Sequence, residues 1–333
     1  MPLPEQFRCW LVEKTPDGVV SSSITERKTA ELPTGDVTVR VAWSSLNYKD
    51  ALAATGHPGV ARTFPHVPGI DAAGVVAEST SPEFPVGTEV IATGHELGTE
   101  RWGGWAEFIR VPSAWLVKRP AGLTLEEAMT IGTAGFTAAQ SVQALIHAGV
   151  TPERGPILVT GATGGVGSMA VQLLAQLGYT VTAVSGKPDR VEWLQQLGAK
   201  AVIDCETFLQ VPNRPLLSAT WAGGVDTVGG TMLATLLRSV SHRGCVAACG
   251  LVGGADFSLT VYPFILRGIT LAGIDSAWCP EPERAEIWNR LATDWKPTHL
   301  ADSQTVISLD QVRPAVEQIL KGQLAGRTVV CIG

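Results

Sequence analysis

The amino-acid sequence predicts an α/β protein in which a doubly wound parallel sheet follows a β-rich segment. Strand-like and helix-like segments alternate from residue 157 to residue 248, and this alternation is typical of a parallel sheet with helices on both faces. Short β-like runs separated by Gly and Pro occupy residues 1–127. A chain of 333 residues has room for two domains, because about 100–200 residues make one domain.

The first 127 residues contain several short segments rich in β-branched and aromatic side chains. Turn residues bound these segments, which predicts a barrel-like or irregular β domain rather than helices. The expected strands are residues 37–41, 74–77, 89–92 and 106–111.

Apolar spacing changes from strand-like to helix-like several times after residue 128. The expected strands are residues 157–160, 180–184, 201–203, 225–228 and 244–248, and the expected helices are residues 166–177, 190–197 and 232–240. After about residue 275 the pattern gives a helix at 284–291, an extended run at 303–307, a helix at 311–320 and a strand at 327–332. Periodicity alone leaves open whether this tail returns to the first domain or closes the second.

Composition excludes several function classes. The hydrophobic fraction of 45% and the charged fraction of 17% fit a compact protein with sizeable cores. A net charge of −6 argues against a broad nucleic-acid face, which needs clustered Lys and Arg. The N-terminal residues lack a basic stretch followed by an apolar run, so we expect a cytoplasmic protein. The six cysteines form no CxxC pair, and we expect buried free thiols.

A glycine-rich turn carries the strongest chemical signal. Gly161, Gly164, Gly165 and Gly167 follow an expected strand and open an expected helix. Glycines let a backbone approach a pyrophosphate, and the helix N-terminus supplies unpaired N–H groups. The spacing departs from a literal GxGxxG, but the strand–turn–helix context favours a Rossmann-type dinucleotide loop over a tight packing turn.

The end of the next strand predicts which nucleotide binds. An NAD site usually places Asp or Glu there for the ribose hydroxyls, whereas this chain has Ser185, Gly186 and Lys187, with Arg190 one turn later. A lysine can pair with a 2′-phosphate, so we expect NADPH as the cofactor. Asp189 lies close by, and we expect it to cap or begin the following helix.

Several motifs, in this order along the chain, resemble the medium-chain dehydrogenase/reductase superfamily. They are residues 45–50 (SLNYKD), 68–74 (PGIDAAG), 102–107 (WGGWAE), 132–138 (GTAGFTA) and the phosphate loop. The best match is the branch of quinone oxidoreductases and acryloyl-CoA reductases, and the resemblance runs from about residue 7 to residue 331. It implies a GroES-like substrate domain at 1–127, a Rossmann dinucleotide-binding domain inserted at 128–275 and a return segment at 276–333. It also implies a homodimer.

The zinc-ligand positions of this superfamily are replaced here. Asn47 stands where zinc alcohol dehydrogenases have their cysteine, and Gly69, Ile70 and Asp71 stand where they have a Gly-His-Glu segment. The four-cysteine structural lobe is also missing. Isoleucine and asparagine do not make a zinc ligand set, so we expect no metal, and we interpret the Gly-His-Glu at residues 94–96 as a loop without one.

The resemblance places Tyr48 in the cofactor cleft, where it would hydrogen-bond cofactor or substrate or form a wall. It brings Asn47, Asp50 and Asp71 to the same region, either as catalytic groups or as groups that cap and hold loops. Arg327 would contact the cofactor or pair across the domain seam. The full set of expected cofactor-binding residues is Tyr48, Thr163, Gly164, Gly165, Val166, Ser185, Gly186, Lys187, Arg190, Leu251, Ile265, Ser276 and Arg327.

These observations predict an NADPH-dependent, zinc-independent reductase of an activated C=C bond. The leading expectation is reduction of acryloyl-CoA to propionyl-CoA by hydride transfer to the β-carbon. A quinone or small-enone oxidoreductase is the alternative within the enzyme class, and a non-catalytic NADPH-binding protein is the alternative outside it.

Overall fold

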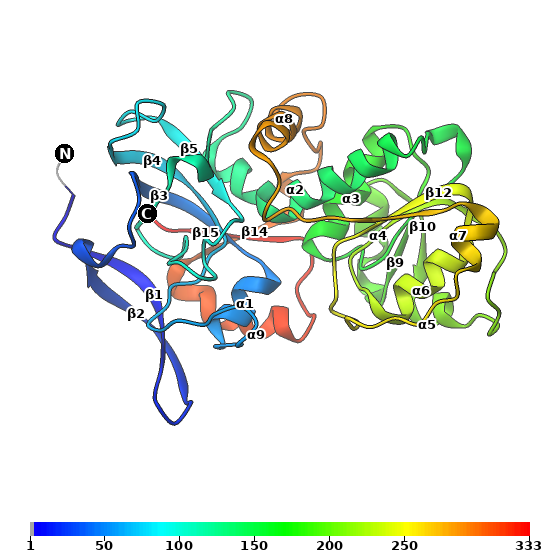
Figure 1. The fold of residues 1–333 in the computed structure, drawn as a ribbon, viewed down its shortest axis with the longest axis horizontal. Helices are drawn as coiled ribbons and strands as arrows, with labels where there is room; N and C mark the ends of the chain where they lie inside the picture. The colour runs from blue at the N-terminus through cyan, green and yellow to red at the C-terminus, as the bar shows by residue number, and fades with distance from the viewer. Residues whose placement is uncertain (1–2) are drawn as a thin grey trace. The chain divides into compact units, whose positions relative to one another are not determined.

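The computed structural model describes residues 3–333, and the chain divides into two compact units. The first unit contains the residues up to Thr133, together with Ala277–Ala292 and Leu300–Gly333. The second contains Ala134–Ser276 and Thr293–His299. Figure 1 traces the chain through both units from blue to red.

The first unit is built on a β-sheet that the C-terminal strands complete. Its order is β14-β15-β3-β4-β5-β7, with β6 also paired to β3, and β1 and β2 form a separate antiparallel pair. The strands are β1 (Gln6–Lys14), β2 (Val20–Lys28), β3 (Val37–Leu46), β4 (Asp71–Ser79), β5 (Glu89–Thr93), β6 (Phe108–Val111), β7 (Leu116–Lys118), β14 (Gln304–Ser308) and β15 (Arg327–Cys331). The helices are α1 (Tyr48–Ala54), α8 (Glu281–Leu291) and α9 (Val312–Leu320).

Alternation along β3 explains the core of this unit. Val37, Val39 and Val41 point to one side, where they pack with buried residues of β4, β5 and β6. A second apolar cluster includes Phe7, Trp10 and Trp105 together with residues of α9. The β15 strand runs antiparallel to β3, and this pairing places the tail beside the first part of the chain.

The second unit is a parallel sheet in the order β10-β9-β8-β11-β12-β13. Its strands are β8 (Ile157–Val159), β9 (Val181–Ser185), β10 (Ala199–Asp204), β11 (Trp221–Asp226), β12 (Val240–Ala248) and β13 (Thr270–Gly273). Its helices are α3 (Gly165–Gln176), α4 (Val191–Gln196), α5 (Cys205–Leu209), α6 (Gly230–Ser239) and α7 (Tyr262–Arg267). Figure 1 shows α3 on one side of this sheet and α5 and α6 on the other. Helix α2 (Leu125–His147) contains the boundary between the two units.

The predicted α/β architecture is confirmed: the second unit has a doubly wound parallel sheet, and the first unit is rich in β-strands. The strand expected at residues 225–228 is displaced, since β11 runs from Trp221 to Asp226. Gly223 and Gly224 hid its first half, because glycine has low strand propensity. Close packing explains both glycines. A Cβ at Gly223 would lie 2.6 Å from the Cys245 carbonyl oxygen, and a Cβ at Gly224 would lie 2.8 Å from the Leu236 side chain.

None of the helices in the described part of the chain has the length and apolar run that a membrane span requires.

Candidate functional site

A buried polar cluster lies where β3 ends and α1 begins. Asn47 precedes α1, and its backbone N–H donates to the Asp50 carboxylate at 2.8 Å. Asp50 also accepts from the backbone N–H groups of Gly69 (3.1 Å) and Ile70 (2.7 Å). This fully buried carboxylate therefore fixes the start of α1 against the loop that leads into β4.

Asp71 gathers donors from three parts of the first unit. Its carboxylate accepts from Ser45 Oγ at 2.5 Å, from Asn47 Nδ2 at 2.8 Å and from Thr133 Oγ1 at 2.6 Å. The Thr133 backbone N–H lies 3.0 Å from both carboxylate oxygens. Asp71 is fully buried, and these donors replace the water that a carboxylate would otherwise need.

Arg327 supplies the positive charge of this cluster. Its guanidinium donates to the Thr130 carbonyl at 2.9 Å and to Asn47 Oδ1 at 3.1 Å, and Nη2 lies 3.8 Å from Asp71 Oδ2. Burial lowers the pKa of Arg327 while the two aspartates raise it, and an arginine starts so high that it stays charged. Burial, together with the nearby Asp71 charge, raises the pKa of Asp50 to about 7.

Gly132 makes room for the cluster. It interrupts α2 with φ +49°, and a Cβ there would lie 2.6 Å from Asp71 Oδ2 and 2.8 Å from Arg327 Nη2. A side chain at this position would therefore be strained in the backbone and would displace the ion pair. The resemblance motifs at 45–50 and 132–138 contain Ser45, Gly132 and Thr133, but the motifs by themselves predict no role for these residues, and Thr130 lies outside both motifs.

Tyr48 differs from the other expected catalytic residues because it is open to solvent. It is the first residue of α1 and is 37% exposed, whereas Asp50 and Asp71 are 0% exposed. Asn47 is half-buried, with its amide group bound within the cluster. The geometry thus suits Tyr48 to touch a ligand, and it suits the aspartates and Arg327 to hold the segments around it.

The residues at the two zinc-ligand positions are an asparagine that is hydrogen-bonded within the cluster and a buried isoleucine. The Asn47 amide belongs to the cluster, and Ile70 is buried. The described residues hold no group of three His, Cys, Asp or Glu side chains that could bind a metal ion.

His95, in the Gly-His-Glu segment, packs between aromatic rings. It stacks on Trp115 at 5.2 Å and meets the edge of Trp278 at 5.9 Å. Burial, with Arg284 nearby, lowers the pKa of His95 to about 4, so its ring is neutral at pH 7.

The phosphate loop connects β8 to α3 in the second unit. Gly161 has φ +58°, and a Cβ at Gly167 would lie 2.3 Å from the Gly161 carbonyl oxygen. Among the described residues, no side chain caps α3 and no acidic residue stands in its first turn. The backbone N–H groups at Gly165 and Val166 therefore face the loop at the positive end of a twelve-residue helix, which fits a bound pyrophosphate.

The end of β9 carries a hydroxyl pair and a lysine. Ser185 Oγ donates to Thr163 Oγ1 at 3.4 Å and accepts from the Lys187 backbone N–H at 3.1 Å. Burial, together with Arg190, lowers the pKa of Lys187, which stays half-buried. Asp189 lies outside the strand in a short 3₁₀ turn, where it forms a solvent-exposed pair with Arg190 at 3.3 Å, so no carboxylate stands at the end of β9 itself. This arrangement fits a 2′-phosphate better than two ribose hydroxyls.

Three of the remaining expected cofactor residues lie elsewhere in the second unit, and Arg327 lies in the first. Leu251 follows β12 and Ile265 lies on α7, and their side chains are 61% and 68% exposed. Ser276 Oγ accepts from Thr137 Oγ1 at 2.8 Å. The structure leaves Leu251 and Ile265 available to a ligand, while Arg327 lies within the buried cluster of the first unit.

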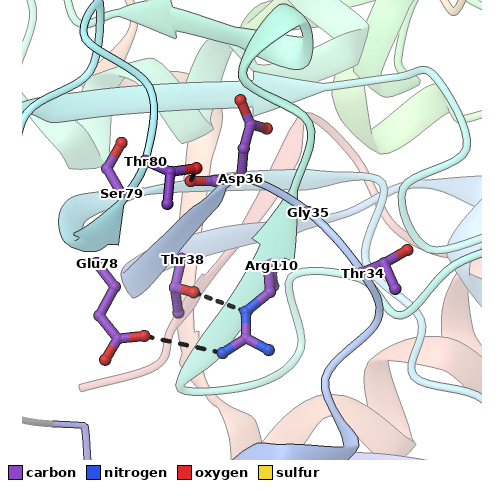
Figure 2. Close-up of a pocket in the computed structure, with 8 residues that line it drawn as sticks. All are labelled: Thr34, Gly35, Asp36, Thr38, Glu78, Ser79, Thr80 and Arg110. Carbon is purple, nitrogen blue, oxygen red and sulfur yellow. Dashed lines mark hydrogen bonds and ion pairs between the residues drawn. The ribbon is translucent and has the colours of Figure 1, made fainter.

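A further pocket lies in the first unit, and Figure 2 shows the residues that line it. Its volume is about 480 Å³. Arg110 donates to Thr38 Oγ1 at 2.9 Å and lies 3.9 Å from the Glu78 carboxylate, so its charge is already paired. The lining set includes none of the expected site residues: Thr34, Gly35, Asp36, Thr38, Glu78, Ser79, Thr80 and Arg110.

Two family models match this chain. The alcohol dehydrogenase GroES-like domain matches residues 33–121, and the zinc-binding dehydrogenase model matches residues 165–292. The chain is 49% identical to the probable acrylyl-CoA reductase AcuI of Escherichia coli, over 94% of this chain and 96% of that protein. It is 45% identical to the putative quinone oxidoreductase YhfP of Bacillus subtilis, over 97% and 98%. The chain belongs to the medium-chain dehydrogenase/reductase superfamily.

Solved structures of relatives agree with this membership. The yhdH oxidoreductase of Salmonella enterica in complex with NADP matches with a TM-score of 0.95 and 47% identity, covering 98% of this chain and 100% of that one. The Bacillus subtilis protein yhfP with NAD bound matches with a TM-score of 0.96 and 44% identity, covering 99% and 100%. The predicted family, its zinc-free branch and the oxidoreductase class are thereby confirmed.

Proposed function

We propose that this oxidoreductase uses NADPH, without zinc, to reduce the activated C=C bond of acryloyl-CoA to propionyl-CoA. The observation that carries the cofactor choice is the end of β9, where Lys187 follows the Ser185–Thr163 hydroxyl pair and Asp189 is paired with Arg190. The solved relative in complex with NADP supports the same cofactor, and the relative named probable acrylyl-CoA reductase supports the substrate. A reductase of quinones or small enones is the second candidate, favoured by the relative named quinone oxidoreductase.

In this proposal one residue of the chain contacts the substrate and several others position that residue. A bound nicotinamide would supply hydride to the β-carbon, negative charge would develop on the carbonyl oxygen of the substrate, and a proton from water or a side chain would then add to the α-carbon. Tyr48 is an exposed tyrosine at the start of α1, and in this proposal its hydroxyl donates a hydrogen bond to that oxygen. Asn47, Asp50, Asp71 and Arg327 hold α1 so that Tyr48 keeps its direction. The donor set at Asn47 and Ile70 does not suit zinc, so the hydroxyl takes the place of a Lewis acid.

Replacement of Lys187 by Ala should discriminate between the two dinucleotides. We expect the KM for NADPH to rise about tenfold, because a charge-assisted contact to the 2′-phosphate is lost. The KM for NADH should stay the same, because NADH lacks that phosphate. Lys200→Ala, an exposed lysine on β10, is the matched control. Equal rises with both cofactors would contradict the assignment, as would a wild-type KM for NADH at or below that for NADPH.

The substrate is tested by following NADPH oxidation with acryloyl-CoA, crotonoyl-CoA and a benzoquinone. We expect the largest kcat/KM with acryloyl-CoA. Preference for the benzoquinone would establish the second candidate instead. Tight NADPH binding without turnover of any of the three would favour a non-catalytic NADPH-binding protein.

Tyr48→Phe removes the proposed hydroxyl donor and little else. We expect kcat to fall about a hundredfold, the usual loss for one donor to a developing oxyanion. Tyr262→Phe is the control, because Tyr262 is also exposed but lies on α7 of the second unit. If Tyr48→Phe and Asn47→Ala both leave kcat and KM unchanged, the assignment of this site is wrong.

We extend the proposal to a homodimer formed through the second unit. Strand β13 lies at the end of its sheet and pairs with β12 on one side. The second unit also carries exposed apolar side chains, among them Val252, Val261 and Leu266 at 58%, 63% and 56% exposure. Such an edge and such side chains are typical of protein–protein contacts. Light scattering should give twice the chain mass of 35.1 kDa, and a single-chain mass at every concentration would contradict the dimer.

A further inference from the structure

Strands β8 and β11 are neighbours at the point where the strand order of the second unit reverses. In the order β10-β9-β8-β11-β12-β13, the chain runs outward from β8 to β10 on one side of this point and from β11 to β13 on the other. In open α/β sheets, ligands bind outside the carboxyl ends of the strands at such a switch point. The residues that end β8 and β11 therefore lie at the place where this fold binds its ligand.

A set of short hydrogen bonds joins these two strand ends. Thr160, which opens the phosphate loop, donates its hydroxyl to Asp226 Oδ1 at 2.7 Å. The Thr227 backbone N–H donates to Thr160 Oγ1 at 3.1 Å, and Thr227 Oγ1 donates to the Thr160 carbonyl at 2.9 Å. Thr160 is thus held at its hydroxyl and at its carbonyl. Gly161 follows directly, and a Cβ there would lie 2.3 Å from Thr227 Oγ1.

The same strand end also holds the loop that carries Leu251. The Asp226 carbonyl accepts from the Cys249 backbone N–H at 3.0 Å, and the Val228 carbonyl accepts from the Gly253 backbone N–H at 2.8 Å. Two loops with expected cofactor contacts, the phosphate loop and the loop after β12, therefore take their positions from residues 226–228.

The carboxylate of Asp226 is buried and accepts hydrogen bonds from two different segments. Its side chain is fully buried, and it accepts from the Gly229 backbone N–H at 2.8 Å as well as from Thr160. Burial raises the pKa of Asp226, and the bonds from Thr160 and Gly229 lower it. A buried charge is costly unless donors satisfy it, and the donors here belong to the phosphate loop and to the start of α6.

We infer that Asp226, acting through Thr160 and Thr227, is a positioning residue for the dinucleotide. It holds the phosphate loop and the Leu251 loop at a set separation across the β8–β11 crevice, so that both reach one bound cofactor. None of these three side chains needs to touch the cofactor. The inference rests on the proposed binding of NADPH at the phosphate loop.

Isosteric variants test this inference in the full-length protein. Thr160→Val and Thr227→Val each remove one hydroxyl, and Thr160→Ser and Thr227→Ser keep it while removing a methyl group. Thr182→Val is the matched control, because Thr182 is a buried threonine on β9 outside these contacts. The dissociation constant for NADP⁺ is measured by calorimetry, and kcat and both KM values are measured at saturating cosubstrate.

We expect the two valine variants to weaken NADP⁺ binding about tenfold, equivalent to about 1.4 kcal/mol. At saturating NADPH, kcat and the KM for the acyl substrate should stay close to wild type, and the serine variants should bind NADP⁺ as wild type does. Thr160→Val combined with Asp226→Asn should weaken binding by less than the product of the two single effects, because both remove the same contact.

Three results would overturn the inference. Folded valine variants with wild-type affinity would show that the contacts do not position the loop. Equal losses in the valine and serine variants, or in Thr182→Val, would show that packing rather than the hydroxyl matters. If the wild-type protein does not bind NADP⁺, both the proposed cofactor and this inference are wrong. If the wild-type protein binds NADP⁺ and the valine variants bind it equally well, only this inference is wrong.

Discussion

The first unit depends on satisfying one buried carboxylate, that of Asp71. Its donors come from the end of β3, from the residue before α1 and from Thr133 in α2, and Arg327 approaches from β15. A carboxylate without these partners would be too costly to bury. The segments that provide them must therefore meet, and the C-terminal tail must return to β3. Gly132 follows from the same constraint, because the cluster leaves no room for a Cβ there.

The second unit also contains a buried carboxylate whose hydrogen bonds must be satisfied, that of Asp226. Its carboxylate is also fully buried, and its donors also come from different segments, namely the start of the phosphate loop and the start of α6. In both units a short acidic side chain at or next to a strand end holds loops that the sheet alone would leave loose. Backbone hydrogen bonds define the strands, but side-chain bonds define where the connecting loops lie.

The groups proposed to touch ligands lie next to buried, hydrogen-bonded residues rather than among them. Tyr48 is exposed one residue after Asn47, and Lys187 is half-buried two residues after Ser185. A rigid buried network next to an accessible group is the arrangement that a preorganised site requires, because the accessible group loses little freedom when its ligand arrives. The expected catalytic set therefore separates into one accessible side chain and several that orient it.

The sequence by itself determined the strand–helix alternation, the phosphate loop and the replaced zinc positions, because periodicity, glycine spacing and ligand chemistry are local properties. It missed the first half of β11, where two glycines conceal a strand that close packing stabilises. Only the tertiary structure decided that Asp50, Asp71 and Arg327 are buried together while Tyr48 is exposed. It alone also joined Thr160 to Asp226, which are 66 positions apart. Burial and hydrogen-bond partners depend on which distant segments meet, and no local pattern records that meeting.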